Sequence, residues 1–168
     1  LFEKIVENAP SWDRCTEVQF NIAVILDEAG RYMDALDAYE VIAAVYPDSE
    51  YAGEAAFGKA RCCYVLSEKA SYDERSAREA ISVLSRFLRD YPDNKNVEQA
   101  GEYLESLKDR LAGMYYERAV FYDRKAKKPE AAVIAYSDFL TRFPFSEKAG
   151  EVNNRIKELE AELEKKNE

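Results

Sequence analysis

The sequence predicts an all-α fold, a right-handed α-solenoid of helix-turn-helix repeats, on three observations. Apolar and aromatic residues recur at steps of four, three and four positions, which places each set on one stripe of a helix. Each stripe ends at a proline, which disfavours helix at the residue before it. Only 6 Gly and 5 Pro occur among 168 residues, so long irregular segments are not expected. A pattern that recurs along the whole chain indicates a repeat protein.

Four proline-terminated stripes mark the second helix of each repeat. Their residues are Phe2, Ile5 and Ala9 before Pro10; Ala35, Tyr39, Ile42 and Tyr46 before Pro47; Ala80, Leu84, Phe87 and Tyr91 before Pro92; and Ala132, Tyr136, Phe139 and Phe143 before Pro144. A polar residue after each proline is expected to cap the next helix, because its side chain accepts a hydrogen bond from a free backbone N–H. The candidates are Ser11, Asp48 or Ser49, Asp93 or Asn94, and Ser146.

The first helix of the first complete repeat is expected over residues 12–29. It is apolar on nearly every side, which predicts a helix buried on several sides between stacked neighbours. Gly30 ends this helix, and Tyr32 begins its partner. The repeating unit is therefore a helix, a tight turn, a second helix and a proline.

The later repeats are longer than the first. We expect an insertion at Ser67–Arg75, after which Ser76 and Glu79 restart the helix as a capping box. A single long helix is expected over Val97–Lys125, with at most a slight bend at Gly113, because glycine weakens a helix without blocking it as proline would. The last helix carries its apolar residues on one stripe, namely Val152, Ile156, Leu159 and Leu163.

Composition excludes several classes of function. The net charge is −9, whereas nucleic-acid binding needs clustered Lys and Arg, so nucleic acid is not an expected partner. With 3 Cys and no His, the chain has no set of zinc ligands, and Cys62 and Cys63 are expected to fill the core. No nucleophile elbow, phosphate-binding loop or dinucleotide-binding loop occurs. We therefore predict a non-enzyme with no catalytic, cofactor-binding or metal-binding residues.

Residues 16–49 resemble the tetratricopeptide repeat. The matching positions are Ala23, Leu26, Gly30, Tyr32, Ala35, Tyr39 and Pro47, whereas Gln19 stands where that family usually has Trp. The resemblance implies one solenoid domain over residues 1–168, with about three full helical hairpins and partial repeats at both ends. Because the first residue is Leu1 rather than Met, we expect the chain to be a fragment of a longer protein.

A narrower resemblance lies in residues 80–94 and 107–144. The run Leu107–Ala112, followed by Ala119, Phe121-Tyr122 and Ala131-Ala132, is similar to the BamD (YfiO) family of the outer-membrane β-barrel assembly machinery. The resemblance implies a protein-binding scaffold at the periplasmic face of the bacterial outer membrane, soluble as this fragment. Its partners would be assembly components or unfolded β-barrel clients, with membrane attachment only through a lipid anchor missing from this chain. Another tetratricopeptide adaptor of the cell envelope, or the regulatory or binding domain of a larger protein, are the alternatives.

Two protein-binding surfaces are expected. An offset of 37 residues aligns the first helices of two repeats and predicts a groove lined by Phe20, Val24, Asp27, Phe57, Arg61 and Tyr64. A docking surface is expected on the long helix, at Lys108, Arg110, Tyr115 and Arg118. Tyr and Arg are frequent interface anchors. The alternative for both sets is that the rings pack in the core and the charges are solvated.

Overall fold

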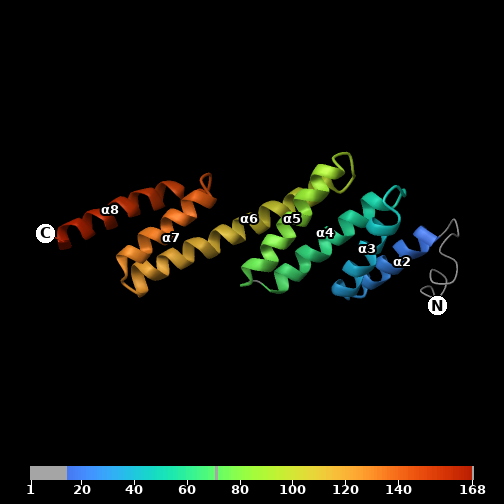
Figure 1. The fold of residues 1–168 in the computed structure, drawn as a ribbon, viewed down its shortest axis with the longest axis horizontal. Helices are drawn as coiled ribbons and strands as arrows, with labels where there is room; N and C mark the ends of the chain where they lie inside the picture. Colours follow the sequence, from blue (N-terminus) through green and yellow to red (C-terminus); the bar gives the residue numbers. More distant parts are fainter. Residues whose placement is uncertain (1–14, 71, 168) are drawn as a thin grey trace. The chain divides into compact units, whose positions relative to one another are not determined.

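The computed structural model describes residues 15–70 and 72–167, and every regular element in these ranges is a helix (Figure 1). In chain order they are α2 (Cys15–Glu28), α3 (Tyr32–Val45), α4 (Ala52–Lys69), α5 (Glu74–Asp90), α6 (Val97–Val120), a π-helical turn η1 (Phe121–Lys125), α7 (Pro129–Arg142) and α8 (Ala149–Asn167). The predicted all-α repeat fold is confirmed. The stripe before Pro10 and the cap at Ser11 lie outside the described residues.

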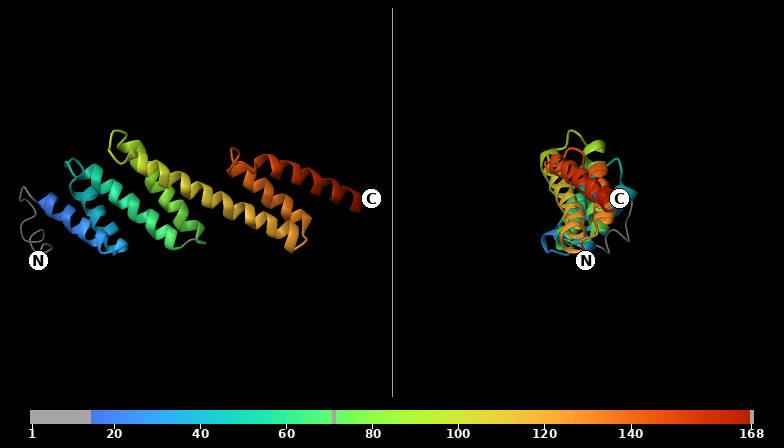
Figure 2. Two further views of the ribbon diagram at one scale, coloured as in Figure 1. Left: turned by 180° about the vertical axis from the view of Figure 1, so that it is seen from behind. Right: turned by 90° about the vertical axis from the view of Figure 1, so that its left-hand side faces the viewer.

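The chain divides into two compact units, and their boundary falls within α6, between Leu107 and Lys108. In the first unit, α3 packs against both α2 and α4, and α4 packs against α5. In the second unit, α7 packs against α8 and η1, and Figure 2 shows α7 and α8 side by side. The expectation of a single solenoid domain over residues 1–168 stays a prediction.

The three described proline loops share one backbone geometry. The residue before proline has φ of −131°, −132° and −129° and ψ of 53°, 59° and 57° at Tyr46, Tyr91 and Phe143. Proline forces its predecessor out of the helical region, which explains the common geometry. Two successive turns of backbone hydrogen bonds then lead into the next helix, as from Ser49 N–H to the Tyr46 carbonyl at 3.2 Å. The repeat in the sequence is therefore a repeat in the backbone.

The prediction of which side chains cap the helices is wrong in detail. No side chain caps α4, so neither Asp48 nor Ser49 has that role. Asn94 and Ser146 instead accept hydrogen bonds from the N–H two residues on, at 2.9 and 3.4 Å, and so stabilise the turn before the helix. Backbone hydrogen bonds in the turns already satisfy N–H groups at the start of these helices. The polar side chains therefore only stabilise the turns.

The expected insertion and capping box are also corrected. The α4 helix continues to Lys69, and Ser67 is buried inside it. The cap of α5 is Asp73, whose carboxylate accepts from the N–H groups of Arg75 and Ser76 at 3.1 and 3.2 Å. An Asp at this position satisfies two free donors at once and its charge favours a helix N-terminus. The extra length is therefore mostly an extended helix.

The long helix is confirmed as continuous from Val97 to Val120, and its last expected residues wind as the π-helical η1. The first helix is expected to be buried on several sides, but the side chain of Ile25 on it is 54% exposed. Among the described elements, α2 packs mainly on α3 and less on α4.

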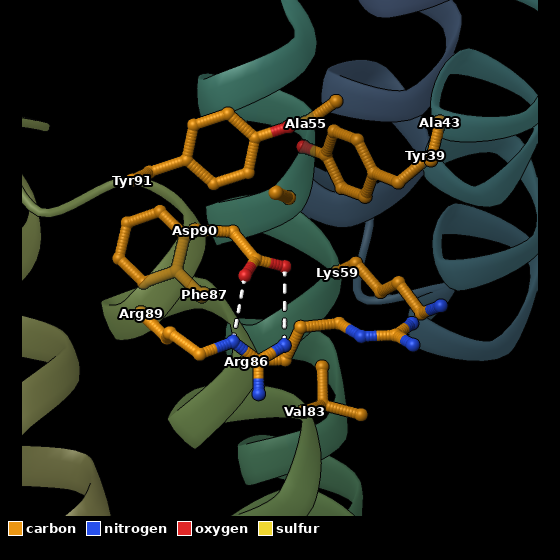
Figure 3. Close-up of a pocket in the computed structure, with 11 residues that line it drawn as sticks. Tyr39, Ala43, Ala55, Lys59, Val83, Arg86, Phe87, Arg89, Asp90 and Tyr91 are labelled. Atoms are coloured by element: carbon orange, nitrogen blue, oxygen red, sulfur yellow. Dashed lines mark hydrogen bonds and ion pairs between the residues drawn. The ribbon is translucent and has the colours of Figure 1, made fainter. Parts of the chain in front are cut away.

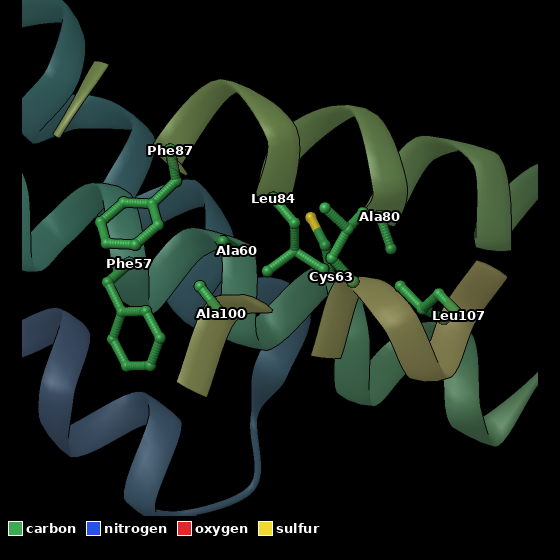
Figure 4. Close-up of a cluster of buried hydrophobic side chains, with 9 residues drawn as sticks. Phe57, Ala60, Cys63, Ala80, Leu84, Phe87, Ala100 and Leu107 are labelled. Atoms are coloured by element: carbon green, nitrogen blue, oxygen red, sulfur yellow. The ribbon is translucent and has the colours of Figure 1, made fainter. Parts of the chain in front are cut away.

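Small residues are buried at the same position of each described stripe. Ala35, Ala80 and Ala132, one from each described stripe, are fully buried, as their shared position predicts. Figure 4 shows the main cluster of the first unit, where side chains from α4, α5 and α6 meet; its larger members are Phe57, Leu84, Phe87 and Leu107. The bulky residues thus surround contacts that only Ala or Gly permits.

The cysteines fill the core, as expected. Cys15, Cys62 and Cys63 are buried and none forms a disulfide. Burial raises the pKa of the Cys62 thiol to about 12 and that of Cys63 to about 11. Both thiols therefore stay protonated and unreactive near neutral pH.

Gly58 packs against the ring of Tyr39 so closely that a Cβ there would lie 2.4 Å from its Cζ. Tyr39 is itself buried and cannot move aside. We predict that Gly58→Ala destabilises the protein by about 1–3 kcal/mol through overpacking, although alanine favours helix. The free energy of unfolding in urea measures this.

Gly101 is the matched control, since it also lies inside a helix but a Cβ added to it would meet nothing within 4 Å. Gly101→Ala should stabilise the protein by about 0.5–1 kcal/mol. Equal effects of the two substitutions would contradict the close contact between α3 and α4.

Candidate protein-binding surfaces

The six expected groove residues occupy α2 and α4, but two of them are not at the surface. Phe57 is only 9% exposed and packs against Phe87, with ring centroids 5.5 Å apart. Asp27 is buried as well. Phe20 is half-buried against Tyr51. The structure thus leaves four half-buried groove positions, namely Phe20, Val24, Arg61 and Tyr64, and the binding role of the groove stays a prediction.

Asp27 joins three helices. Its carboxylate forms an ion pair with Arg61 of α4 and accepts a hydrogen bond from the Tyr39 hydroxyl of α3 at 3.4 Å. Burial, together with the charge of Asp27, raises the pKa of Tyr39 well above its ordinary value, so the hydroxyl remains a donor. A buried carboxylate needs such partners, because an unpaired charge in the interior is costly.

The same contact recurs in the second unit. Asp123 of η1 receives two hydrogen bonds of 2.8 Å from the guanidinium of Arg155 in α8. The hydroxyl of Tyr136 in α7 donates to the same carboxylate at 3.2 Å. The Arg155 hydrogen bonds lower the pKa of Asp123, whereas burial and the carboxylate raise the pKa of Tyr136 to about 12. A two-pronged pair of this kind is stronger and more directional than a single contact.

In the middle repeat an aromatic contact replaces the Asp–Arg–Tyr contact. Tyr64, which aligns with Asp27, stacks on Tyr103 with ring centroids 4.2 Å apart and an interplanar angle of 11°. Leu84 stands where the other stripes carry Tyr39 and Tyr136. Sequence reasoning missed the Asp–Arg–Tyr contacts. The available signal was an Asp 12 or 13 residues before the stripe tyrosine, since Asp27 and Asp123 both hold that place.

The four expected docking residues do not form one exposed cluster. Tyr115 is only 4% exposed and packs edge-on against Phe143, so its expected surface position is wrong. The guanidinium of Arg118 lies 4.2 Å from the Tyr115 ring centroid and also pairs with Asp138 at 3.3 Å. Lys108 is exposed and Arg110 is half-buried. Tyr115 belongs to the apolar stripe of the helix, and a docking role for the other three stays a prediction.

A groove of about 290 Å³ lies between α3, α4 and α5 in the first unit (Figure 3). We call it the α3–α5 groove. The rings of Tyr39, Phe87 and Tyr91 line it together with small residues, and Lys59, Arg86 and Arg89 add positive charge. Lys59 pairs with Glu40, and Arg89 pairs with Asp90 at 2.9 Å. Arg86 is exposed and has no ion-pair partner in the described part of the chain.

Figure 3 shows the side chains of Arg86 and Lys59 directed toward the same end of this groove. Aromatic rings with nearby cations suit a partner that offers apolar side chains and a carboxylate. Sequence reasoning did not find this groove, because it forms where α3 and α5 both pack against α4, and the periodicity does not show that arrangement.

A second hollow, of about 340 Å³, lies in the second unit between α6, α7 and the loop before α8. Phe145 lines it and is 99% exposed, whereas the two preceding proline loops carry Asp48 and Asp93 at this position. In the residues that the structure describes, no group of His, Cys, Asp and Glu is placed to hold a metal ion. None of the described helices is both long and apolar enough to cross a membrane.

The fold and these surfaces define a helical repeat protein of the tetratricopeptide class, which binds other proteins. A tetratricopeptide repeat profile matches residues 17–49. The profile of the YfiO family, described as an outer membrane lipoprotein, matches residues 59–167. This is well over half of the chain, and the chain belongs to this family. A comparison with curated proteins gave no match.

Membership confirms the resemblance seen in the sequence, since the match over residues 59–167 includes both segments that carry it, 80–94 and 107–144. Both families are scaffolds for protein–protein interaction rather than enzymes, and the family description indicates a place in the cell envelope.

We predict that Arg155→Met destabilises the protein by about 2–4 kcal/mol, because it leaves the Asp123 carboxylate, only 4% exposed, without its counter-charge. Arg31→Met is the control, since Arg31 and Asp34 are 63% and 50% exposed and such a pair contributes about 0–1 kcal/mol. Urea unfolding followed by circular dichroism compares the two. Similar losses of unfolding free energy in the two variants would show that the buried pair stabilises the protein no more than the exposed pair.

The contact of Asp123 with Arg155 also predicts that the stability of the protein depends on pH. Because the pKa of Asp123 is lowered in the folded state, its stabilisation is fully present above the ordinary Asp value of about 3.9 and is lost as pH falls through the lower folded value. Asp123→Asn should therefore be less stable than the parent protein near neutral pH, by about 1–3 kcal/mol. The difference should shrink below pH of about 4. A difference that is constant with pH would contradict this assignment.

Proposed function

We propose that this protein is a scaffold of the BamD type, which holds components or clients of outer-membrane β-barrel assembly at the periplasmic face of the outer membrane. The observation that carries the proposal is the family match over residues 59–167. The helical repeats supply the extended surface that such a scaffold needs.

The α3–α5 groove is the surface we propose for an extended client segment. Transmembrane β-strands alternate apolar with polar residues and carry aromatic residues near their ends. The apolar side chains of such a segment would contact Phe87 and Tyr91, and an acidic group would meet Arg86, whose charge has no ion-pair partner in the described residues. The groove has room for a few side chains, which suits a short motif rather than a folded domain.

Lys108, Arg110 and Arg118 remain the proposed docking positions for a folded partner of the assembly machinery. Arg118 pairs with Asp138, Lys108 is exposed and Arg110 is half-buried. A local positive charge on a chain of net charge −9 orients an acidic partner more than it adds affinity.

The groove is tested by fluorescence anisotropy with a labelled peptide from the last strand of an outer-membrane barrel. Arg86→Glu should weaken binding by about five- to tenfold, since a rim charge steers and holds an acidic group. Ala43→Trp should abolish binding, because Ala43 lines the groove and is exposed, so a large ring there fills the space without disturbing the core.

Arg75→Glu is the control for charge, since Arg75 is exposed on the same helix but does not line the groove. It should leave the affinity unchanged beyond a small effect of net charge. Full binding by Ala43→Trp would remove the α3–α5 groove from consideration and leave only the general scaffold function.

A further inference from the structure

The turn between α6 and α7 gathers positive charge on an acidic chain. Residues 124–128 read Arg-Lys-Ala-Lys-Lys, four basic residues in five positions, whereas the whole chain has a net charge of −9. We call these five residues the basic turn. All four basic side chains are exposed. The second unit thus carries a strongly charged patch that the scaffold function does not use.

The basic turn differs from the rest of the described chain in its ion pairs. Elsewhere in the described residues, most arginines form ion pairs, as Arg61, Arg78, Arg89, Arg142 and Arg155 do. None of the four basic side chains at the turn has an ion-pair partner in the described ranges. The nearest acid in sequence is Asp123, but Arg155 and Tyr136 hold its carboxylate on the buried side. The Asp–Arg–Tyr contact therefore engages the carboxylate that directly precedes the turn, and the five residues of the turn contain no acid themselves.

The backbone at the turn favours glycine, and a lysine is present instead. Lys127 has φ of 50°, the only non-glycine residue at positive φ in the described chain. The position aligned with it in the first hairpin is Gly30, with φ of 74°. A side chain in this left-handed conformation is strained relative to glycine. The chain thus places a positive charge at a position where folding alone would favour Gly.

An exposed ring lies beside these charges. The side chain of Phe121 is 51% exposed at the start of η1, and its ring packs edge-on against Tyr122 with centroids 5.7 Å apart. The π-helical turn widens the backbone here, and such turns are frequent at functional sites. Basic residues next to an exposed aromatic ring are typical of segments that lie on a membrane surface.

We propose that the basic turn, with Phe121, binds the surface of an anionic phospholipid membrane. Three of its four charges are lysines, whose compact ammonium groups suit a diffuse layer of headgroup phosphates, whereas paired recognition of a protein carboxylate favours the arginine fork. The family is one of outer membrane lipoproteins, so a membrane surface is within its reach. The contact goes beyond the proposed scaffold function and does not depend on it.

Cosedimentation of the whole chain with vesicles tests the proposal. Vesicles of phosphatidylcholine with about a third phosphatidylglycerol should bind the protein, and vesicles of phosphatidylcholine alone should not. Because the chain as a whole is acidic and its contact with anionic lipid would be electrostatic, binding should be lost at high salt. Combined replacement of Lys125, Lys127 and Lys128 by Gln should reduce binding by about a hundredfold, at about fivefold for each charge.

Lys127→Gly separates binding from folding. It should weaken vesicle binding about fivefold while the melting temperature rises or stays unchanged, because glycine relieves the left-handed conformation. The matched control removes three exposed charges elsewhere by combining Arg75→Gln, Lys157→Gln and Lys165→Gln, and it should bind as well as the parent to within about threefold.

Three results would overturn the proposal: equal binding to neutral vesicles, an equal loss in the control variant, or no vesicle binding by the parent protein. If the lysine variants bind vesicles normally but lose an acidic protein partner, the turn is a protein-docking surface instead. Peptide binding in the α3–α5 groove is measured separately, so failure here leaves the proposed scaffold function untouched.

Discussion

The close approach of neighbouring helices at small residues is the constraint on which the rest of this structure depends. Gly58 lets the ring of Tyr39 lie directly on α4, and the fully buried Ala35, Ala80 and Ala132 hold the same place in each described stripe. Once the helices are this close, a hydroxyl on one helix reaches a carboxylate on another. The contact of Tyr39 with Asp27 exists only because the packing brings α2, α3 and α4 together.

The buried carboxylates then decide where charge remains at the surface. Asp27 and Asp123 each engage an arginine and a tyrosine, so their negative charges are balanced inside the helix packing. In the second unit the engaged carboxylate of Asp123 directly precedes the basic turn. A contact that stabilises the fold thus also affects the surface, because a carboxylate paired within the helix packing is less available to its neighbours in sequence.

The repeats are not equivalent, and the two units carry different candidate binding surfaces. The first unit offers an aromatic groove with cations at its rim, whereas the second unit carries the basic turn and the exposed Phe145. Phe145 and Lys127 both stand where other repeats carry residues that suit a plain loop, namely Asp and Gly. Departures from a repeat pattern at exposed positions add nothing to helix packing, which makes them the natural places to look for function.

The sequence by itself determined the all-α repeat fold, the start of α3 at Tyr32, the continuous α6 and the fully buried alanines, because helical periodicity and proline punctuation are local and follow from steric rules. The tertiary structure alone decided which members of an apolar or charged stripe are buried. It placed Phe57, Asp27 and Tyr115 inside, assembled the α3–α5 groove, and paired Asp123 with Arg155 across 32 residues. Periodicity gives the direction in which a side chain points along its own helix, whereas burial and pairing depend on the neighbouring helix that covers it.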